Sequence, residues 1–435
     1  MKTDTFKTSI FILLIGGFIT KIFGFIIKIL FTRTIGVEGI SLYTIVMPTY
    51  SLLITVATFA LPVSISKLVS EEVVRSKTIV FSTACFILLF NVFFIVLILF
   101  LAPFIATYLL KQPEVTPIIW AMAFTLPFIS ISSILKGYFL GKFRVTPNTI
   151  SNIFEQLFRI FFLIFILPYF ASKNVMLGVI LFILVNIITE LISIFTFTCF
   201  LPKKALLQRE HLKIQKNIIG RVMSISIPNV SSRFIGNIGF FLEPIILTNL
   251  LLISGYSNDF ILTEYASYNA YAIGLLTLPS FFVSAICQIL IPEISKFHAQ
   301  KNKCMIKKRL KQALLYSFLI GFVSSVFILW FRDTLLTLLY NTTRGSDYIL
   351  ALAPFFVLFY LEAPLSSTLQ ALDQSKTTMK ITLYGMILKL LLLSILSLLH
   401  IGLYSLVISE ICNIIFVVSL HIRVILKYFR NNFEI

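Results

Sequence analysis

Two lysines interrupt an otherwise apolar stretch near the start of the sequence, GGFITKIFGFIIKIL at residues 16–30. Gly17, Lys21, Gly24 and Lys28 follow one another at spacings of 4, 3 and 4, which places them on one face of a helix. A charged side chain near the centre of a lipid layer costs about 2.5–3.5 kcal/mol, so this face should line protein or a watery cavity. Its ammonium groups suit an anionic ligand or carboxylates on other helices. Lys28 lies nearer the end of the stretch and can also extend to the surface.

A second polar stripe lies in the apolar residues 147–169. Asn148, Asn152, Glu155 and Arg159 recur there at helical spacing. The guanidinium group of Arg159 is a further candidate contact for an anion. Because Glu155 and Arg159 are four residues apart, they can instead neutralise each other, and both interpretations stay open at this point.

Charges also interrupt the apolar residues 221–252. The sequence SRFIG resembles TKIFG of the first stretch and places Arg233 opposite Lys21. Asn237 continues the polar line of Arg233, and Glu243 follows further along the same predicted helix. Further charges within apolar stretches are Glu190, Glu362, Lys389 and Glu410. If the protein couples its activity to an ion gradient, the carboxylates of Glu155, Glu190 and Glu243 are the candidate proton or sodium sites.

Catalytic and metal-binding patterns are missing from the sequence. It contains no phosphate-cradling GxxxxGK[ST] and no HExxH, and its four histidines are far apart. The five cysteines include no CxxC pair, which argues against a thiolate metal site and against a disulfide framework. We therefore expect neither an enzyme nor a protein that needs a metal or another cofactor.

The elements that position these charges are predicted to be membrane helices. Of the 435 residues, 58% are hydrophobic, and the mean hydropathy of +0.99 is that of a polytopic membrane protein. We predict an all-α fold with about twelve spans. They are residues 9–31, 41–65, 79–102, 116–136, 147–169, 175–200, 221–252, 265–291, 311–332, 348–372, 378–399 and 401–422.

The net charge of +18 is explained by basic residues in the loops between predicted spans, and it does not indicate a nucleic-acid partner. Lys and Arg concentrate in alternate connections between the predicted spans, as they do on the inner side of a membrane. Both termini are therefore predicted to be cytoplasmic, and the protein to be a multi-pass protein of the cell membrane. The basic residues 203–217 should lie as an amphipathic segment against anionic membrane lipids.

The two halves of the chain share short sequences in the same order. ALPVSISKLVSE at residues 60–71 matches ILIPEISKFHAQ at residues 289–300. Prolines pair in the same way, with Pro48 and Pro62 in one half and Pro279 and Pro292 in the other, and each permits a helix to bend. We predict a six-helix lobe at residues 1–202, a basic linker at 203–220 and a second six-helix lobe at 221–435.

Two stretches carry a family resemblance. Residues 16–71 resemble the opening of the stage V sporulation protein B-like proteins, and IPNVSSRFIGNIGFFLEPIILTN at residues 227–249 is similar to their seventh helix. These proteins belong to the polysaccharide-exporter branch of the multidrug/oligosaccharidyl-lipid/polysaccharide (MOP) flippase superfamily.

The resemblance implies a flippase that moves an undecaprenyl-pyrophosphate-linked saccharide or peptidoglycan precursor outward, for envelope or spore-cortex synthesis. Lys21 matches the first basic cavity position of the lipid II flippases in this superfamily. Lys28 comes one residue later than their second basic position, and PTYSLLIT is uncharged where they have arginine. With Arg159, Arg233 and Asn237, the two lysines form the predicted substrate-binding set.

Two other functions fit the same sequence. A cation-coupled multidrug exporter of this fold would depend on its intramembrane carboxylates rather than on its lysines. A non-transporting scaffold that recruits envelope-synthesis enzymes would depend most on the loop at residues 203–217.

Overall fold

The computed structural model describes residues 6–70, 76–142, 144–201 and 216–431, and these residues form helices and no strand. Such a fold follows from the apolar surroundings, because a membrane helix satisfies its backbone hydrogen bonds within itself. Contacts divide the chain into unit 1, Met1–Phe241, and unit 2, Leu242–Ile435. The boundary between the units falls inside a long helix, α8 (Lys216–Ile253). Most of the predicted linker, residues 203–215, lies outside the described residues.

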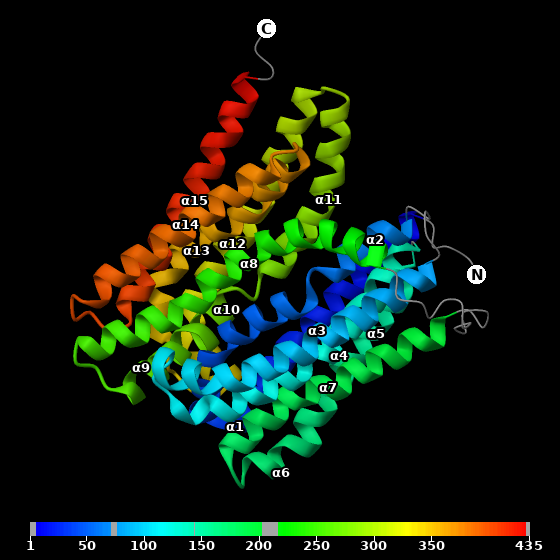
Figure 1. Cartoon of the computed structure of the whole chain (residues 1–435). Helices are drawn as coiled ribbons and strands as arrows, with labels where there is room; N and C mark the ends of the chain where they lie inside the picture. Colours follow the sequence, from blue (N-terminus) through cyan, green and yellow to red (C-terminus); the bar gives the residue numbers. More distant parts are fainter. Residues whose placement is uncertain (1–5, 71–75, 143, 202–215, 432–435) are drawn as a thin grey trace. The chain divides into compact units, whose positions relative to one another are not determined.

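Unit 1 is built on neighbouring long helices, and Figure 1 shows α3, α4, α5 and α7 running alongside one another. Besides the first part of α8, its helices are α1 (Phe6–Thr58), α2 (Leu61–Ser70), α3 (Ser76–Phe104), α4 (Thr116–Gly141), α5 (Thr146–Phe161), α6 (Leu167–Ala171) and α7 (Val175–Phe200). The start of α8 belongs here because Ile218 and Val222 share a buried cluster with Leu61 and Ile65 of α2.

The first two predicted spans are joined without a loop. Helix α1 is 53 residues long and bends at Gly36, whose backbone angles are φ 67° and ψ −169°. A side chain is disfavoured at this positive φ, so glycine allows the turn. The first bend therefore lies at a glycine, and the Pro48 inside α1 leaves its own backbone helical. A second break follows at Phe59 and Ala60, both with positive φ, just before α2 and its Pro62.

Close packing of α4 on α2 depends on glycine. A Cβ atom added at Gly137 would lie 2.9 Å from the backbone oxygen of Pro62, and one at Gly141 would lie 2.6 Å from that of Ser66. Small residues one turn apart let membrane helices approach in this way.

Replacing Gly141 with alanine is therefore expected to lower the stability of the protein by about 1–3 kcal/mol, because α4 must move away from α2. Thermal unfolding in detergent measures the loss. Gly220→Ala is the matched control, since a Cβ atom at Gly220 meets no described atom within 4 Å. Equal melting temperatures for the two variants would contradict this packing.

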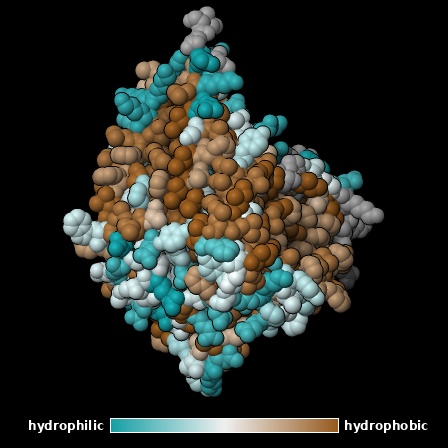
Figure 2. Space-filling view, turned by 90° about the vertical axis from the view of Figure 1, so that its left-hand side faces the viewer, coloured by the Kyte–Doolittle hydropathy of each residue, from teal (hydrophilic) through white to brown (hydrophobic). Residues whose placement is uncertain are grey.

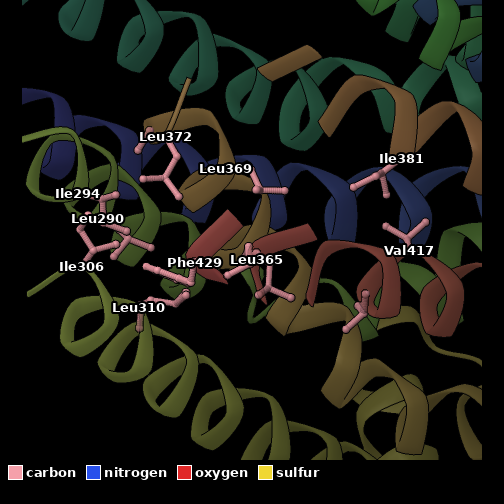
Figure 3. Packing of buried hydrophobic residues seen from close by; sticks show 14 residues of the cluster. Leu290, Ile294, Ile306, Leu310, Leu365, Leu369, Leu372, Ile381, Val417 and Phe429 are labelled. Carbon is pink, nitrogen blue, oxygen red and sulfur yellow. The ribbon is translucent and has the colours of Figure 1, made fainter. Parts of the chain in front are cut away.

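Unit 2 has a core of buried aliphatic side chains. Figure 3 shows side chains of α11, α12, α13, α14 and α15 gathering in this cluster, with Leu369 and Ile294 fully buried. Besides the end of α8, its helices are α9 (Asn258–Ala266), α10 (Gly274–Leu276), α11 (Ser280–Ala299), α12 (Lys303–Tyr340), α13 (Ser346–Ala371), α14 (Ser375–Ser397) and α15 (Tyr404–Asn431).

Residues 265–291 were predicted as one continuous helical span, and this prediction is wrong. The chain there passes through a π-helical segment, Ser267–Ile273, and then α10, and it breaks at Thr277–Pro279 before α11 begins. Pro279 explains the break, because it has no backbone N–H and disfavours helical geometry in the preceding residue.

The described helices are apolar on their outside. Leu89, Phe100 and Trp330 are 73%, 79% and 82% exposed, and Figure 2 shows apolar side chains over a broad part of the face in view. Among the described residues, eleven helical stretches are long and apolar enough to cross a membrane. The first, Ile15–Ser70, has 56 residues and bends at Gly36, so it is long enough for two crossings of about 20 residues each. The prediction of an all-α, multi-pass membrane protein with about twelve membrane helices is confirmed, and the cytoplasmic placement of its termini stays a prediction.

Candidate functional site

The basic face of α1 is open in the structure. Lys21 is exposed and Lys28 is half-buried. A Cβ atom added at Gly17 or Gly24 meets no described atom within 4 Å, so no described neighbour fills the space beside the lysines. Lys28 makes no hydrogen bond or ion pair with another described residue. The face thus has both positive charge and room for a ligand.

On α8, the two predicted site residues differ in their surroundings. Arg233 is exposed, and a Cβ atom at the neighbouring Gly236 meets no described atom within 4 Å. Asn237 is half-buried, and its Nδ2 atom donates a hydrogen bond to Oγ1 of Thr55 on α1 at 2.5 Å. The Asn237 amide therefore joins α8 to α1, whereas the guanidinium group of Arg233 is exposed.

Glu155 and Arg159 of α5 do not pair with each other in the described part of unit 1. Oε1 of Glu155 lies 3.3 Å from Nζ of Lys136 on α4. The NH2 group of Arg159 donates to Oδ1 of Asn186 at 2.7 Å and to Oγ1 of Thr189 at 3.4 Å, both on α7. The pairing of Glu155 with Arg159 along one helix, one of the two interpretations left open by the sequence, is therefore not formed among the described residues, because both side chains reach partners on neighbouring helices.

Three serines stand at the centre of this cluster. Ser132 of α4, Ser151 of α5 and Ser193 of α7 are each fully buried. Oγ of Ser193 lies 3.1 Å from Oγ of Ser132 and 2.5 Å from Oγ of Ser151, and Ser151 also donates to Oε1 of Glu155 at 3.3 Å. Glu190 of α7 is 7% exposed, and its Oε2 atom has no hydrogen-bond partner among the described residues. Helices α4, α5 and α7 therefore hold two of the predicted ion-coupling carboxylates, Glu155 and Glu190, in one network.

Lys136 and the three serines are not among the site residues predicted from the sequence. A signal for them is present, because each of the three helices carries a serine three or four residues from a charged residue and therefore on the same face. The pairs are Ser132 with Lys136, Ser151 with Glu155, and Glu190 with Ser193.

The third predicted ion-coupling residue, Glu243, lies in unit 2 in a separate cluster. Its Oε2 atom lies 2.6 Å from Nζ of Lys389 on α14, and Oε2 of Glu410 on α15 lies 2.6 Å from the same nitrogen. Tyr265 donates a hydrogen bond to Oε1 of Glu243 at 3.4 Å. One ammonium group thus stands between two carboxylates, and the Glu243 side chain is only 5% exposed.

This ion triad, Glu243–Lys389–Glu410, joins three helices of unit 2. Charges removed from water need close partners to offset the loss of hydration, and both carboxylates find theirs in Lys389. The sequence showed all three as charges in apolar stretches but not which of them pair.

The sequence matches two family models and two sporulation proteins. The sequence model described as polysaccharide biosynthesis protein matches residues 6–298, and the one described as MatE matches residues 244–395. The chain is 32% identical to stage V sporulation protein B of Bacillus subtilis (strain 168) over 98% of its own length and 85% of that protein. It is 22% identical to sporulation protein YkvU of the same organism, over 98% of this chain and 96% of that one.

Solved structures share the fold. One, described as the inward-facing conformation of a multidrug resistance MATE family transporter of the MOP superfamily, matches with a TM-score of 0.73 and 13% identity over 95% of this chain and 96% of that chain. Another, a MOP superfamily transporter from Pyrococcus furiosus, matches with a TM-score of 0.64 and 13% identity over 98% and 96%.

The expected resemblance is thereby confirmed. The first family model covers more than half of the chain, and the sporulation relative aligns with nearly all of it. The chain belongs to the polysaccharide biosynthesis protein family and is a membrane transporter of the flippase type, not an enzyme.

Proposed function

We propose that the protein flips an anionic, lipid-linked saccharide across the membrane by alternating access. The substrate would be an undecaprenyl-pyrophosphate-linked saccharide or peptidoglycan precursor, used in envelope or spore-cortex synthesis. The observation that carries the proposal is the open basic face of α1, where Lys21 and Lys28 share a face with Gly17 and Gly24, and a Cβ atom added at either glycine would meet no described atom within 4 Å. The relationship to a sporulation protein supports the cellular role.

The chemistry of this face fits a pyrophosphate. Ammonium and guanidinium groups form charge-assisted hydrogen bonds with phosphate oxygens, and these are stronger than hydrogen bonds between neutral groups. Lys21 would hold the head group, Arg233 would be a second anchor and Lys28 a weaker contact. The lipid tail would stay in the bilayer, where it needs no protein pocket.

The other two residues of the predicted set have additional roles. Arg159 is hydrogen-bonded to α7 and Asn237 to α1, so each contributes to the packing of unit 1. Their contact with substrate stays a prediction.

A cation-coupled multidrug exporter is the second candidate. The buried carboxylates Glu155 and Glu190 favour it, because such a protein needs acids that can take up and release a cation. Ion-gradient-driven efflux of an organic cation from vesicles containing the purified protein would support the exporter. Movement of a lipid-linked pyrophosphate saccharide between the leaflets of the same vesicles would support the flippase.

Replacing Gly24 with leucine tests the open face directly. The added side chain has space, so the protein should fold normally, and leucine is also the better helix former. It would project between Lys21 and Lys28 and displace the head group, which should slow translocation roughly tenfold. Reconstituted vesicles with equal protein content measure the rate.

Gly220→Leu is the matched control, because Gly220 on α8 is equally open but lies outside the proposed site. If Gly24→Leu translocates as fast as Gly220→Leu, the face between the two lysines does not receive the head group.

A further inference from the structure

The last helix of unit 2, α15, presents three positive charges on one exposed face. Arg423, Lys427 and Arg430 follow one another at spacings of four and three, and all three side chains are exposed. These three residues form the cationic face of α15. A hollow of about 690 Å³ lies against it, and its volume is in the range of pockets that hold a small molecule. The described residues that line the hollow are Ser419, Ile422, Arg423, Leu426, Lys427 and Arg430.

The charges of the cationic face are not balanced by carboxylates among the described residues. Within α15 the sequence has one acid, Glu410, which belongs to the ion triad, and none of the three cations forms an ion pair with a described residue. Arg309 of α12, by contrast, is paired with Glu293 of α11 at 3.0 Å. The dipole of α15 favours Arg430 in its last turn, but not Arg423, which lies about two turns earlier. The face therefore suits an anion from outside the chain.

An apolar stripe on α15 leads to the same cations. Ile408, Ile415 and Ile422 recur at intervals of seven residues, and all three are exposed. From Ile408 to Ile422 the helix rises by about 21 Å, which exceeds the depth of one leaflet's hydrocarbon, about 15 Å. Leu426, also exposed, continues the stripe into the hollow between the charges. A ligand that fits both parts has an anionic group at one end and a hydrocarbon chain at the other.

The opposite side of α15 is packed, and this holds the cationic face outward. Val417, Ile425 and Phe429 belong to the buried cluster of unit 2, and α14 runs alongside α15 (Figure 1). On α12, Nζ of Lys307 lies 5.4 Å from the centre of the Phe429 ring. Turning the face inward would replace buried aliphatic and aromatic groups with three charges. The orientation of the face is therefore set before any ligand binds.

We propose that the cationic face of α15 binds an anionic phospholipid of the membrane. The guanidinium groups of Arg423 and Arg430 match the geometry of phosphate oxygens, and the ammonium group of Lys427 adds a third charge. An acyl chain would lie along the isoleucine stripe. A free phosphate would use the cations but not the stripe, so the face favours a lipid.

The predicted topology agrees with this ligand. With both termini cytoplasmic, the end of α15 lies at the inner leaflet, where anionic lipids attract basic residues and where basic pockets beside membrane helices bind their head groups. The proposed ligand is a component of the bilayer and not the transported saccharide, so the proposal does not rest on the flippase function.

Native mass spectrometry of the purified, delipidated full-length protein, titrated with phosphatidylglycerol, tests the proposal. We expect the wild type to retain one more phosphatidylglycerol molecule than the Arg423→Gln Lys427→Gln variant, and this molecule to bind the variant roughly tenfold or more weakly. Two hydrogen bonds between charged groups are lost there. Both side chains are exposed, so the variant should melt like the wild type in detergent.

Lys308→Gln Lys311→Gln is the matched control, because it removes the same charge from exposed positions on α12 that do not line the hollow. It should retain as many phosphatidylglycerol molecules as the wild type. Phosphatidylcholine with the same acyl chains, which has no net charge, should not occupy the additional site. Inorganic phosphate at the concentration of the lipid should not displace phosphatidylglycerol, because it makes no contact with the stripe.

The proposal is overturned if the Arg423→Gln Lys427→Gln variant retains as much phosphatidylglycerol as the wild type, or if the α12 control loses as much as that variant. Equal retention of phosphatidylcholine would show that charge does not select the lipid. Displacement by inorganic phosphate would show a site for a free anion, and tighter binding of undecaprenyl phosphate would show a site for a lipid carrier instead. No transport is measured, so each of these failures would leave the flippase proposal standing.

Discussion

Vesicles containing the Lys21→Ala Arg233→Ala double variant are expected to translocate lipid-linked saccharide no faster than empty vesicles. A hydrogen bond to a charged group contributes about 1.5–3 kcal/mol, and each 1.4 kcal/mol is a factor of ten. Each single variant should therefore lose roughly 10- to 100-fold in rate, and the double variant on the order of 100-fold or more. Both side chains are exposed, so their removal should not unfold the protein.

A second pair of lysines provides the control for charge alone. Lys308 and Lys311 are exposed on α12, and their replacement by alanine removes the same two positive charges away from the proposed site. This control should translocate at the wild-type rate, and Lys21→Arg should keep more activity than Lys21→Ala. Equal rates for the two double variants would remove Lys21 and Arg233 from the mechanism.

The largest expected effect on stability is at Lys389. Replacing it with methionine fills a similar volume but leaves the carboxylates of Glu243 and Glu410 facing each other without a cation. Removing one partner from a buried ion pair costs about 3–5 kcal/mol, so the variant should melt at a much lower temperature in detergent or fail to yield monodisperse protein.

Neutralising the two carboxylates of the triad tests whether their uncompensated charge causes the loss of stability in Lys389→Met. Adding Glu243→Gln and Glu410→Gln to Lys389→Met removes the uncompensated charges and should restore part of the lost stability. Lys380→Met, at an exposed position on the same helix, should be close to wild type. If Lys389→Met is as stable as Lys380→Met, the triad does not stabilise unit 2.

Most of the fold could be predicted from the sequence because lipid imposes a simple pattern. A span needs about 20 apolar residues, and polar residues between such runs mark the connections. The pattern does not predict the backbone where an apolar run continues through a bend. Two spans predicted as separate helices therefore belong to one helix, α1, that bends at Gly36. One span predicted as a single helix is interrupted at Pro279.

The candidate sites were predictable only within single helices. Spacing placed Lys21 and Lys28 on one face, and the structure shows that this face is open. Spacing also suggested that Glu155 would pair with Arg159, but its partner is Lys136 on another helix. Which charges meet depends on how helices pack, and a sequence read helix by helix does not contain that information.

In the proposed function the protein moves an anionic lipid-linked saccharide. The most direct measurement uses vesicles that contain the purified protein and a pyrophosphate-linked lipid saccharide, and follows the arrival of its head group in the opposite leaflet. We expect arrival well above the rate in empty vesicles and its loss in the Lys21→Ala Arg233→Ala variant. Arrival no faster than in empty vesicles, together with gradient-driven export of an organic cation by the same preparation, would contradict the account.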